Sequence, residues 1–157
     1  MFTNNYQALL ERMCTGDNAT TAMYKNITGQ AARDGYNPAN ITKNSPKIHL
    51  GTGTTPPKKT DYVLEAPLDD TLVDTTFAYQ RTQDFTNENS YSQLFVSATN
   101  KSSEQLTANE CALYISGSLG EYMIAREVFD KPKIFEPGET KSFVWKILCS
   151  LICESCI

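Results

Sequence analysis

The sequence lacks any hydrophobic run long enough to cross a membrane. A spanning helix needs about 20 consecutive apolar residues, and no run in this chain of 157 residues approaches the required length. The N-terminal stretch from Phe2 to Met13 is also too polar to be the apolar core of a signal peptide. We therefore expect a soluble protein that is made in the cytosol and has no membrane partner.

Positive charge is also scarce. The chain has 14 Lys and Arg residues against 18 Asp and Glu residues, which gives a net charge of −4 and a pI near 5.0. No local stripe of Lys and Arg compensates for this balance. Proteins that bind nucleic acid attract its phosphates with clustered positive charge, so the sequence indicates no nucleic-acid partner.

Histidine occurs once, at position 49. A Ser-His-Asp or Cys-His arrangement would have to use this residue, and no nucleophile signature accompanies it. His49 stands between Ile48 and Leu50, so we expect it on the polar face of a short strand. We predict no catalytic residues, no cofactor, no small-molecule substrate and no enzymatic activity. An enzyme is the third alternative, and it would need a cleft that gathers His49 with carboxylates or cysteines.

The five cysteines are an odd number and do not suggest a disulfide framework. Cys111 falls in an apolar alternation and is expected to be a small buried hydrophobe. The spacing of Cys149, Cys153 and Cys156 resembles the cluster-binding loop of radical-SAM enzymes, but those enzymes place that loop near the start of a large barrel, and here one residue follows Cys156. A zinc site would want a fourth ligand. We therefore predict a reduced, partly buried C-terminal tail whose role is open.

Three aspartates, Asp69, Asp70 and Asp74, are close enough in sequence to share a cation. The glycine and the distal glutamate of an EF-hand loop are missing, however. The aspartates are better interpreted as a solvated acidic entrance to a strand. The sequence accordingly predicts no metal site.

The most suggestive loop is HLGTGTTPPKKTDY, residues 49–62. A dinucleotide-binding loop needs the pattern G-x-G-x-x-G between a strand and a helix, and here Pro56 stands at the third glycine position. A Walker A loop would need Gly-Lys-Ser/Thr at the required spacing, which is also missing. We interpret this segment as the end of a strand, a Gly/Thr bend and a proline-stiffened surface connection.

The N-terminal residues predict a short amphipathic helix over residues 3–16. Apolar side chains recur at i, i+3, i+4 and i+7, at Tyr6, Leu9, Leu10 and Met13. Asn4 or Asn5 is expected to cap the start of the helix and Gly16 to end it. A helix of this length is marginal alone, so its apolar stripe has to dock on this domain or on a neighbouring subunit. We predict these four apolar residues as assembly contacts.

Residues 17–46 lose this periodicity and are rich in Asn, Thr, Gly and Ala, with a turn-like segment at 35–38. A stretch of this length without obvious elements is uncommon in a compact domain unless it is an arm or an interaction loop. We therefore divide the chain into an N-terminal helix and interaction segment, residues 1–45, and a β-domain with a short C-terminal tail, residues 46–157.

From Lys47 onward the apolar residues alternate with a period of two, which predicts strands. The predicted strands are 47–50, 61–65, 72–82, 91–99, 110–116, 121–129 and 142–148. Turn signals separate them, among them Glu136-Pro137-Gly138-Glu139, which fits a type II turn. This order favours a mainly β fold, an antiparallel, jelly-roll-like β-sandwich with a short N-terminal α-helix and an extended N-terminal arm.

Aromatic residues are frequent in the predicted strands. They are Phe77, Tyr79, Phe95, Tyr114, Tyr122, Phe129, Phe143 and Trp145. They could form a platform that stacks on carbohydrate, as in a binding module. Most of them occupy alternating strand positions, however, where packing in the core or across strands is the ordinary use.

Several short motifs follow one another in an order that resembles small virion proteins of tailed bacteriophages. They are LGTGTTPP from Leu50, DYxLE from Asp61, VSATN from Val96, NExxLY from Asn109, AREV from Ala125 and EPGE from Glu136. The resemblance covers residues 46–148 and implies a β-sandwich building block repeated around a capsid, neck or tail. It does not include the N-terminal segment or the cysteine-containing end.

We therefore predict a structural component of a bacteriophage virion, a capsid-associated, neck or tail protein. It would act through contacts with other copies of itself and with other virion proteins, in a particle assembled in the host cytoplasm. The alternative is a receptor- or carbohydrate-binding β-sandwich module of a tail fibre or adhesin.

Overall fold

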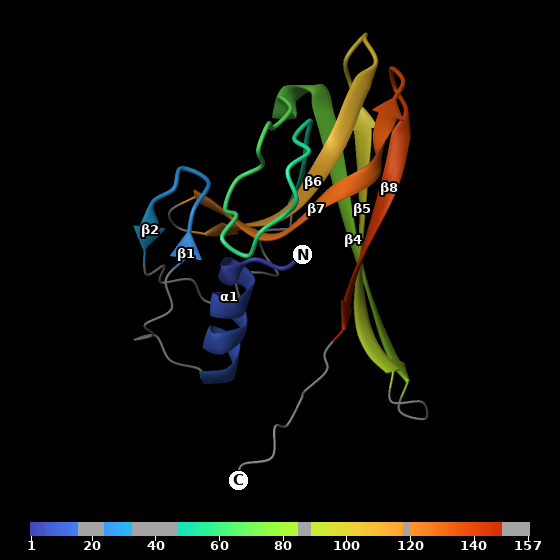
Figure 1. Cartoon of the computed structure of the whole chain (residues 1–157). Coiled ribbons are helices and arrows are strands. Elements are labelled where there is room, and N and C mark those ends of the chain that lie inside the picture. Colours follow the sequence, from blue (N-terminus) through green and yellow to red (C-terminus); the bar gives the residue numbers. More distant parts are fainter. Residues whose placement is uncertain (16–23, 33–46, 85–88, 118–119, 149–157) are drawn as a thin grey trace.

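The chain is mainly β, with two three-stranded antiparallel sheets, a small two-stranded hairpin and a short α-helix (Figure 1). The computed structural model describes residues 1–15, 24–32, 47–84, 89–117 and 120–148. Within these ranges, no helix combines the length and the apolar character that crossing a membrane requires.

The first sheet has the strand order β3-β6-β7, formed by β3 (Lys47–Gly51), β6 (Leu106–Gly117) and β7 (Gly120–Phe135). Two irregularities interrupt the β6–β7 pairing. Ile124 is an extra residue in β7, and residues 129–132 lie opposite Asn109 alone. Such bulges bend a strand and redirect its side chains, so the second half of β7 departs from the regular ladder.

The second sheet has the order β4-β5-β8, formed by β4 (Val73–Asp84), β5 (Asn89–Asn100) and β8 (Thr140–Leu148). One face carries hydroxyl pairs between β5 and β8, such as Ser97–Ser142 at 2.9 Å, together with the exposed apolar side chain of Val144. On the opposite face Val96 and Trp145 are buried. The alternation predicted for these strands is confirmed where side chains are described.

One hydrophobic cluster draws side chains from both sheets and from the N-terminal segment. Its buried members are Ala8, Leu9, Tyr24, Ile48, Leu50, Val96, Ala98, Ala108, Cys111, Leu113, Ile115, Tyr122, Ile124, Ala125, Phe135 and Trp145. Full burial of a large apolar side chain contributes about 1.5–3 kcal/mol. This cluster therefore joins the two sheets to each other and to the helix.

The predicted N-terminal helix is confirmed as α1 (Asn4–Thr15), but its predicted cap is wrong. Asn4 and Asn5 lie inside the helix, and the Asn5 amide instead bonds both backbone groups of Lys25. The residues before the helix pair with β7, where Thr3 donates its amide to the Ile124 carbonyl at 3.0 Å. These long-range bonds anchor the start of the chain on the first sheet.

The segment predicted to lack elements contains a short hairpin, formed by β1 (Tyr24–Lys25) and β2 (Ala31–Ala32). Asn26 organises its turn by accepting bonds from the Thr28 hydroxyl and the Gln30 amide. Sequence periodicity does not detect strands of this length. The turn-like segment predicted at 35–38 lies outside the described residues.

Of two further predictions from the sequence, a turn is confirmed and a strand is wrong. The turn at Glu136–Glu139 is confirmed, since the Glu139 amide donates to the Glu136 carbonyl at 2.9 Å and Gly138 has φ +77°. The strand expected at residues 61–65 is wrong, because these residues form irregular backbone.

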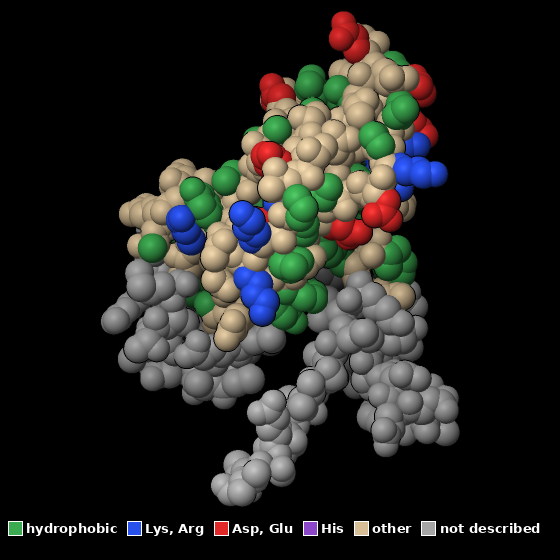
Figure 2. All heavy atoms as spheres, in the orientation of Figure 1, with side chains coloured by type: hydrophobic (Ala, Val, Ile, Leu, Met, Phe, Trp, Pro, Cys, Tyr) green, Lys and Arg blue, Asp and Glu red, His purple; other side chains and the backbone are tan. Residues whose placement is uncertain are grey.

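On the face shown in Figure 2, acidic and basic side chains are interspersed with polar and apolar ones.

Candidate functional site

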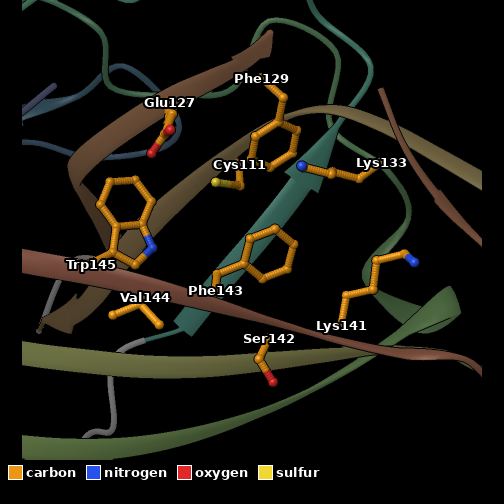
Figure 3. Close-up of a pocket in the computed structure, with 9 residues that line it drawn as sticks. All are labelled: Cys111, Glu127, Phe129, Lys133, Lys141, Ser142, Phe143, Val144 and Trp145. Carbon is orange, nitrogen blue, oxygen red and sulfur yellow. The ribbon is translucent and has the colours of Figure 1, made fainter. Parts of the chain in front are cut away.

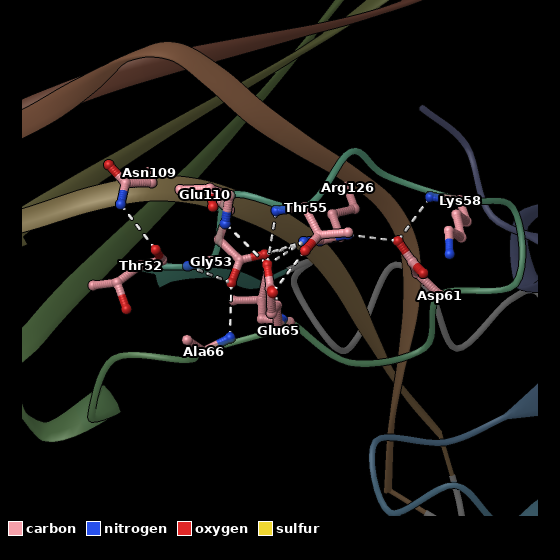
Figure 4. A network of polar contacts seen from close by, with 12 residues as sticks. Thr52, Gly53, Thr55, Lys58, Asp61, Glu65, Ala66, Asn109, Glu110 and Arg126 are labelled. Atoms are coloured by element: carbon pink, nitrogen blue, oxygen red, sulfur yellow. Dashed lines mark hydrogen bonds and ion pairs between the residues drawn. The ribbon is translucent and has the colours of Figure 1, made fainter.

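The Gly/Thr loop, residues 52–55, is held by the side-chain carboxylates of Glu65 and Glu110 (Figure 4). The Gly53 amide donates to Glu110 Oε1 at 3.1 Å. The amides of Thr54 and Thr55 donate to Glu65 Oε2 at 2.9 and 2.8 Å, and the Thr55 hydroxyl donates to Glu65 Oε1. Bonds from the Thr55 hydroxyl and amide, together with the Thr54 amide, hold the pKa of Glu65 below its ordinary value.

Glu110 and Arg126 form the buried centre of this network. Their side chains are 0% and 4% exposed, and Arg126 Nε and Nη2 each lie 2.8 Å from Glu110 Oε2. Arg126 Nη1 donates to Asp61 Oδ2 at 2.7 Å. Glu110 also accepts from the amide of Ala66 at 3.0 Å. Burial opposes the guanidinium charge, but its bonds to Asp61 and Glu110 outweigh that effect and raise the pKa of Arg126.

These contacts distinguish the Gly/Thr loop from a phosphate-binding loop. Backbone amides aimed at an anion are the mark of a phosphate cradle, and here the amides of residues 53–55 bind Glu110 and Glu65 instead. The glycines are required for close approach, because a Cβ on Gly51 or Gly53 would lie 2.5 Å from Glu110 Oε1. The loop therefore fastens the connection between β3 and β4 onto the outer face of the first sheet.

The sequence interpretation missed Glu110 and Arg126 as partners. A signal was present for Glu110, which is the one charged residue of β6, whereas Arg126 stands beside Glu127 in a strand with several charges. The register pairs Ala112 with Arg126 and Glu110 with Val128, so the two charges occupy diagonal positions on one face. Diagonal neighbours in a hairpin are within reach of long side chains.

His49 is buried between two carboxylates, which corrects its expected place on a polar strand face. It is 8% exposed, with Nδ1 2.7 Å from Asp70 Oδ1 and Nε2 3.1 Å from Glu121 Oε2. The Nε2 contact is an ion pair without hydrogen-bond geometry. The ring also meets Tyr114 edge-on, at 4.7 Å between centroids. His49 thus links β3 to β7 and to the short 3₁₀ turn Asp70–Leu72.

The shifted pKa values of His49 and Glu121 follow from the contacts of these side chains. Burial alone would lower the pKa of His49, but Glu121 and Asp70 outweigh burial, and the pKa of His49 is raised above its ordinary value. The contact with His49, opposed by partial burial and aided by a bond from Lys47 at 2.7 Å, lowers the pKa of Glu121 to about 2. The two carboxylates therefore favour the protonated, cationic form of His49 in the folded protein.

We expect the free energy of unfolding to be highest between about pH 4.5 and pH 6.5. The stability from charged His49 is complete below 6.5, its unfolded-state pKa, and is lost as pH rises through its raised folded-state pKa. The stability from Glu121 is complete above 4.5 and is lost as pH falls towards 2. Urea unfolding over this pH range checks the profile. In His49→Gln, which removes the sole histidine, the loss above pH 6.5 should shrink, and an unchanged loss would contradict this assignment.

A groove of about 510 Å³ lies between β7 and β8 (Figure 3). Phe129 and Phe143 stack in it with their ring centroids 5.7 Å apart. The indole Nε1 of Trp145 is buried and has no hydrogen-bond partner among the described residues. The Cys111 thiol lines the same groove, and burial raises its pKa, so it is a protonated thiol and a poor nucleophile.

The predicted assembly residues of the helix have intramolecular contacts where they are described. Leu9 is buried in the cluster that joins the two sheets, and Tyr6 stacks on Phe2 at 4.1 Å between centroids. The side chains of Leu10 and Met13 lie outside the described set. The helix thus docks on this chain, and contact with a neighbouring subunit stays a prediction.

The aspartates and cysteines considered as metal ligands are not gathered into one site where the structure describes them. Asp69 accepts from the Thr71 amide and hydroxyl, and Asp70 bonds His49. Among the described residues, no group of His, Cys, Asp and Glu is arranged to hold a metal ion. Cys149, Cys153 and Cys156 lie outside the described part of the chain.

Comparison with protein-family models, curated proteins and solved structures finds no match for this chain. Its function is therefore inferred from its own residues and their geometry.

Proposed function

We propose that this chain is a structural subunit of a bacteriophage virion and that its two sheets form a jelly-roll-like β-sandwich. The sandwich is supported by the hydrophobic cluster, which takes residues such as Val96 and Trp145 from one sheet and Leu113 and Ile115 from the other. The virion assignment is supported by the ordered motifs between Leu50 and Glu139.

The observation that carries a role in assembly is a groove with three aromatic side chains beside a sheet edge that no described strand covers. β8 pairs only with β5 among the described strands, and the groove lies next to it. An uncovered edge is a template for pairing with another chain. The buried charged groups Glu110, Arg126 and His49, in contrast, have ionic partners within the chain, which suits a structural role for them.

Mass spectrometry of purified phage particles tests the virion role. We expect this chain to be present in many copies per particle, because a subunit that works through repeated contacts is used in multiple copies. A reconstruction of the particle would then locate it on the capsid, the neck or the tail. If the chain occurs in infected-cell lysate and never in particles, the proposal is wrong.

The aromatic groove favours a second candidate, a carbohydrate- or receptor-binding module. Phe129, Phe143 and Trp145 all line it, and aromatic rings stack well on sugars. The first two rings already stack on each other with an interplanar angle of 16°, which leaves less ring face for a ligand. A glycan array probed with the purified chain distinguishes the candidates, because a subunit without a glycan site should leave it blank.

A further inference from the structure

The groove between β7 and β8 has the features of a site for an added β-strand. Its lining includes the rings of Phe129, Phe143 and Trp145, the side chains of Lys133 and Lys141, and the carboxylate of Glu127 (Figure 3). Lys141 pairs with Glu139, whereas Lys133 makes no ion pair among the described residues. Lys133 therefore suits an occupant with an acidic side chain.

Trp145 supplies a second, independent observation. The residue is 8% exposed, and its Nε1–H is buried without an acceptor in the described part of the chain. Figure 3 shows the indole nitrogen turned toward the interior of the groove. Buried N–H groups nearly always have a partner, so an occupant that brings a carbonyl or carboxylate oxygen to this donor would be favoured.

The edges of both flanking strands are available for pairing. Residues Met1–Thr3 already pair with β7 along Met123–Arg126, as an added strand would. Beyond Arg126 no described segment continues this pairing, and β8 has no described partner opposite to β5. Backbone N–H and C=O groups at such an edge bind an extended segment through main-chain hydrogen bonds.

We propose that this groove binds residues 149–157 of a second copy of the chain as an added strand on β8, an inference that rests on the proposed role in assembly. The segment CSLICESCI is rich in apolar residues, contains Glu154 and has no basic residue, which suits the aromatic rings and the two lysines of the groove. Extended, its nine residues reach about 30 Å from the end of β8, far enough to enter a neighbour.

The occupant is a neighbour's segment, because a return into the chain's own groove would need a tight turn directly after Leu148. The segment contains no Gly, Asn or Asp, the residues that the two-residue turns of β-hairpins prefer. A tail that leaves one copy and enters the next makes a head-to-tail contact, and repetition of such contacts produces rings or filaments.

The test uses the full chain under reducing conditions, so that no disulfide joins the copies. Trp145 is the sole tryptophan and reports directly on the groove. As protein concentration rises, the mass from light scattering should increase, and the emission spectrum of Trp145 should change because the groove beside it is filled. A chain that stays monomeric at every concentration overturns the proposal.

Variants in the groove and in residues 149–157 test whether these two surfaces form the contact. Ile152→Asp should weaken association about tenfold or more, because a charge would have to lie against the aromatic side chains of the groove. Lys133→Glu should also weaken it by repelling Glu154, and combining it with Glu154→Lys should restore association. Lys101→Glu, the same charge change at an exposed position outside the groove lining, is the control and should leave association unchanged.

Two other results overturn the proposal. One is association that is unaffected by Ile152→Asp. The other is a monomer at high dilution whose Trp145 is quenched by acrylamide more easily in Ile152→Asp than in the unchanged chain, which would place the segment in its own groove. The virion test is separate, because particles can contain many copies of the chain even when the purified chain shows no association.

Discussion

Replacing Arg126 with methionine is expected to lower the free energy of unfolding by about 3–5 kcal/mol. The substitution leaves the Glu110 carboxylate, which is 0% exposed, without its cationic partner in the interior. Asp61 also loses its bond to Nη1. An unpaired buried charge costs far more than the pair contributes when it is intact. Urea unfolding at neutral pH, followed by circular dichroism, measures the effect.

Two further variants show whether the loss comes from this pair. Lys101→Met removes a cation from an exposed position and should change the unfolding free energy by no more than about 0.5 kcal/mol. The double variant Arg126→Met with Glu110→Gln should lose less than the sum of the two single variants, because the two residues share one interaction. Additive losses, or an Arg126→Met protein as stable as the Lys101→Met control, would show that the pair is not coupled.

Gly51→Ala is expected to lower the free energy of unfolding by about 2–3 kcal/mol through overpacking. The added Cβ would lie 2.5 Å from Glu110 Oε1 and 2.7 Å from the Ala66 carbonyl oxygen. The second of these atoms belongs to the backbone and cannot turn away as a flexible side chain can. The loop would have to move off the sheet, which weakens the bonds from Gly53 and Ala66 to Glu110. Denaturant unfolding again measures the loss.

Gly138→Ala is the matched control for this substitution. A Cβ at Gly138 meets no atom within 4 Å, but the residue has φ +77°. The control should therefore show only the strain of a left-handed residue, about 1–2 kcal/mol. A Gly138→Ala loss equal to or greater than that of Gly51→Ala would indicate that crowding against Glu110 and Ala66 is not the reason for glycine at position 51.

The strands and the helix were predictable because burial on one face imposes a period. Val96 and Ala98 are buried and alternate with partly exposed residues as a strand requires, and the helix shows the spacing of a buried stripe. The turn at Gly138 was predictable because only a few residue types accept its backbone geometry. Elements without a period were missed, and the β1–β2 hairpin and the bulge at residues 129–132 are the examples.

The partners of the polar residues were not predictable. Nothing near His49 in the chain indicates that Asp70 and Glu121 will face it, because 21 and 72 positions separate them from it. Glu110 likewise receives amides from a loop 57 positions away. Alternation along a strand is a local property of the sequence, so it reveals which face is buried. Which charge, amide or neighbouring strand lies against that face depends on contacts between distant segments, and these exist only once the sheets have packed.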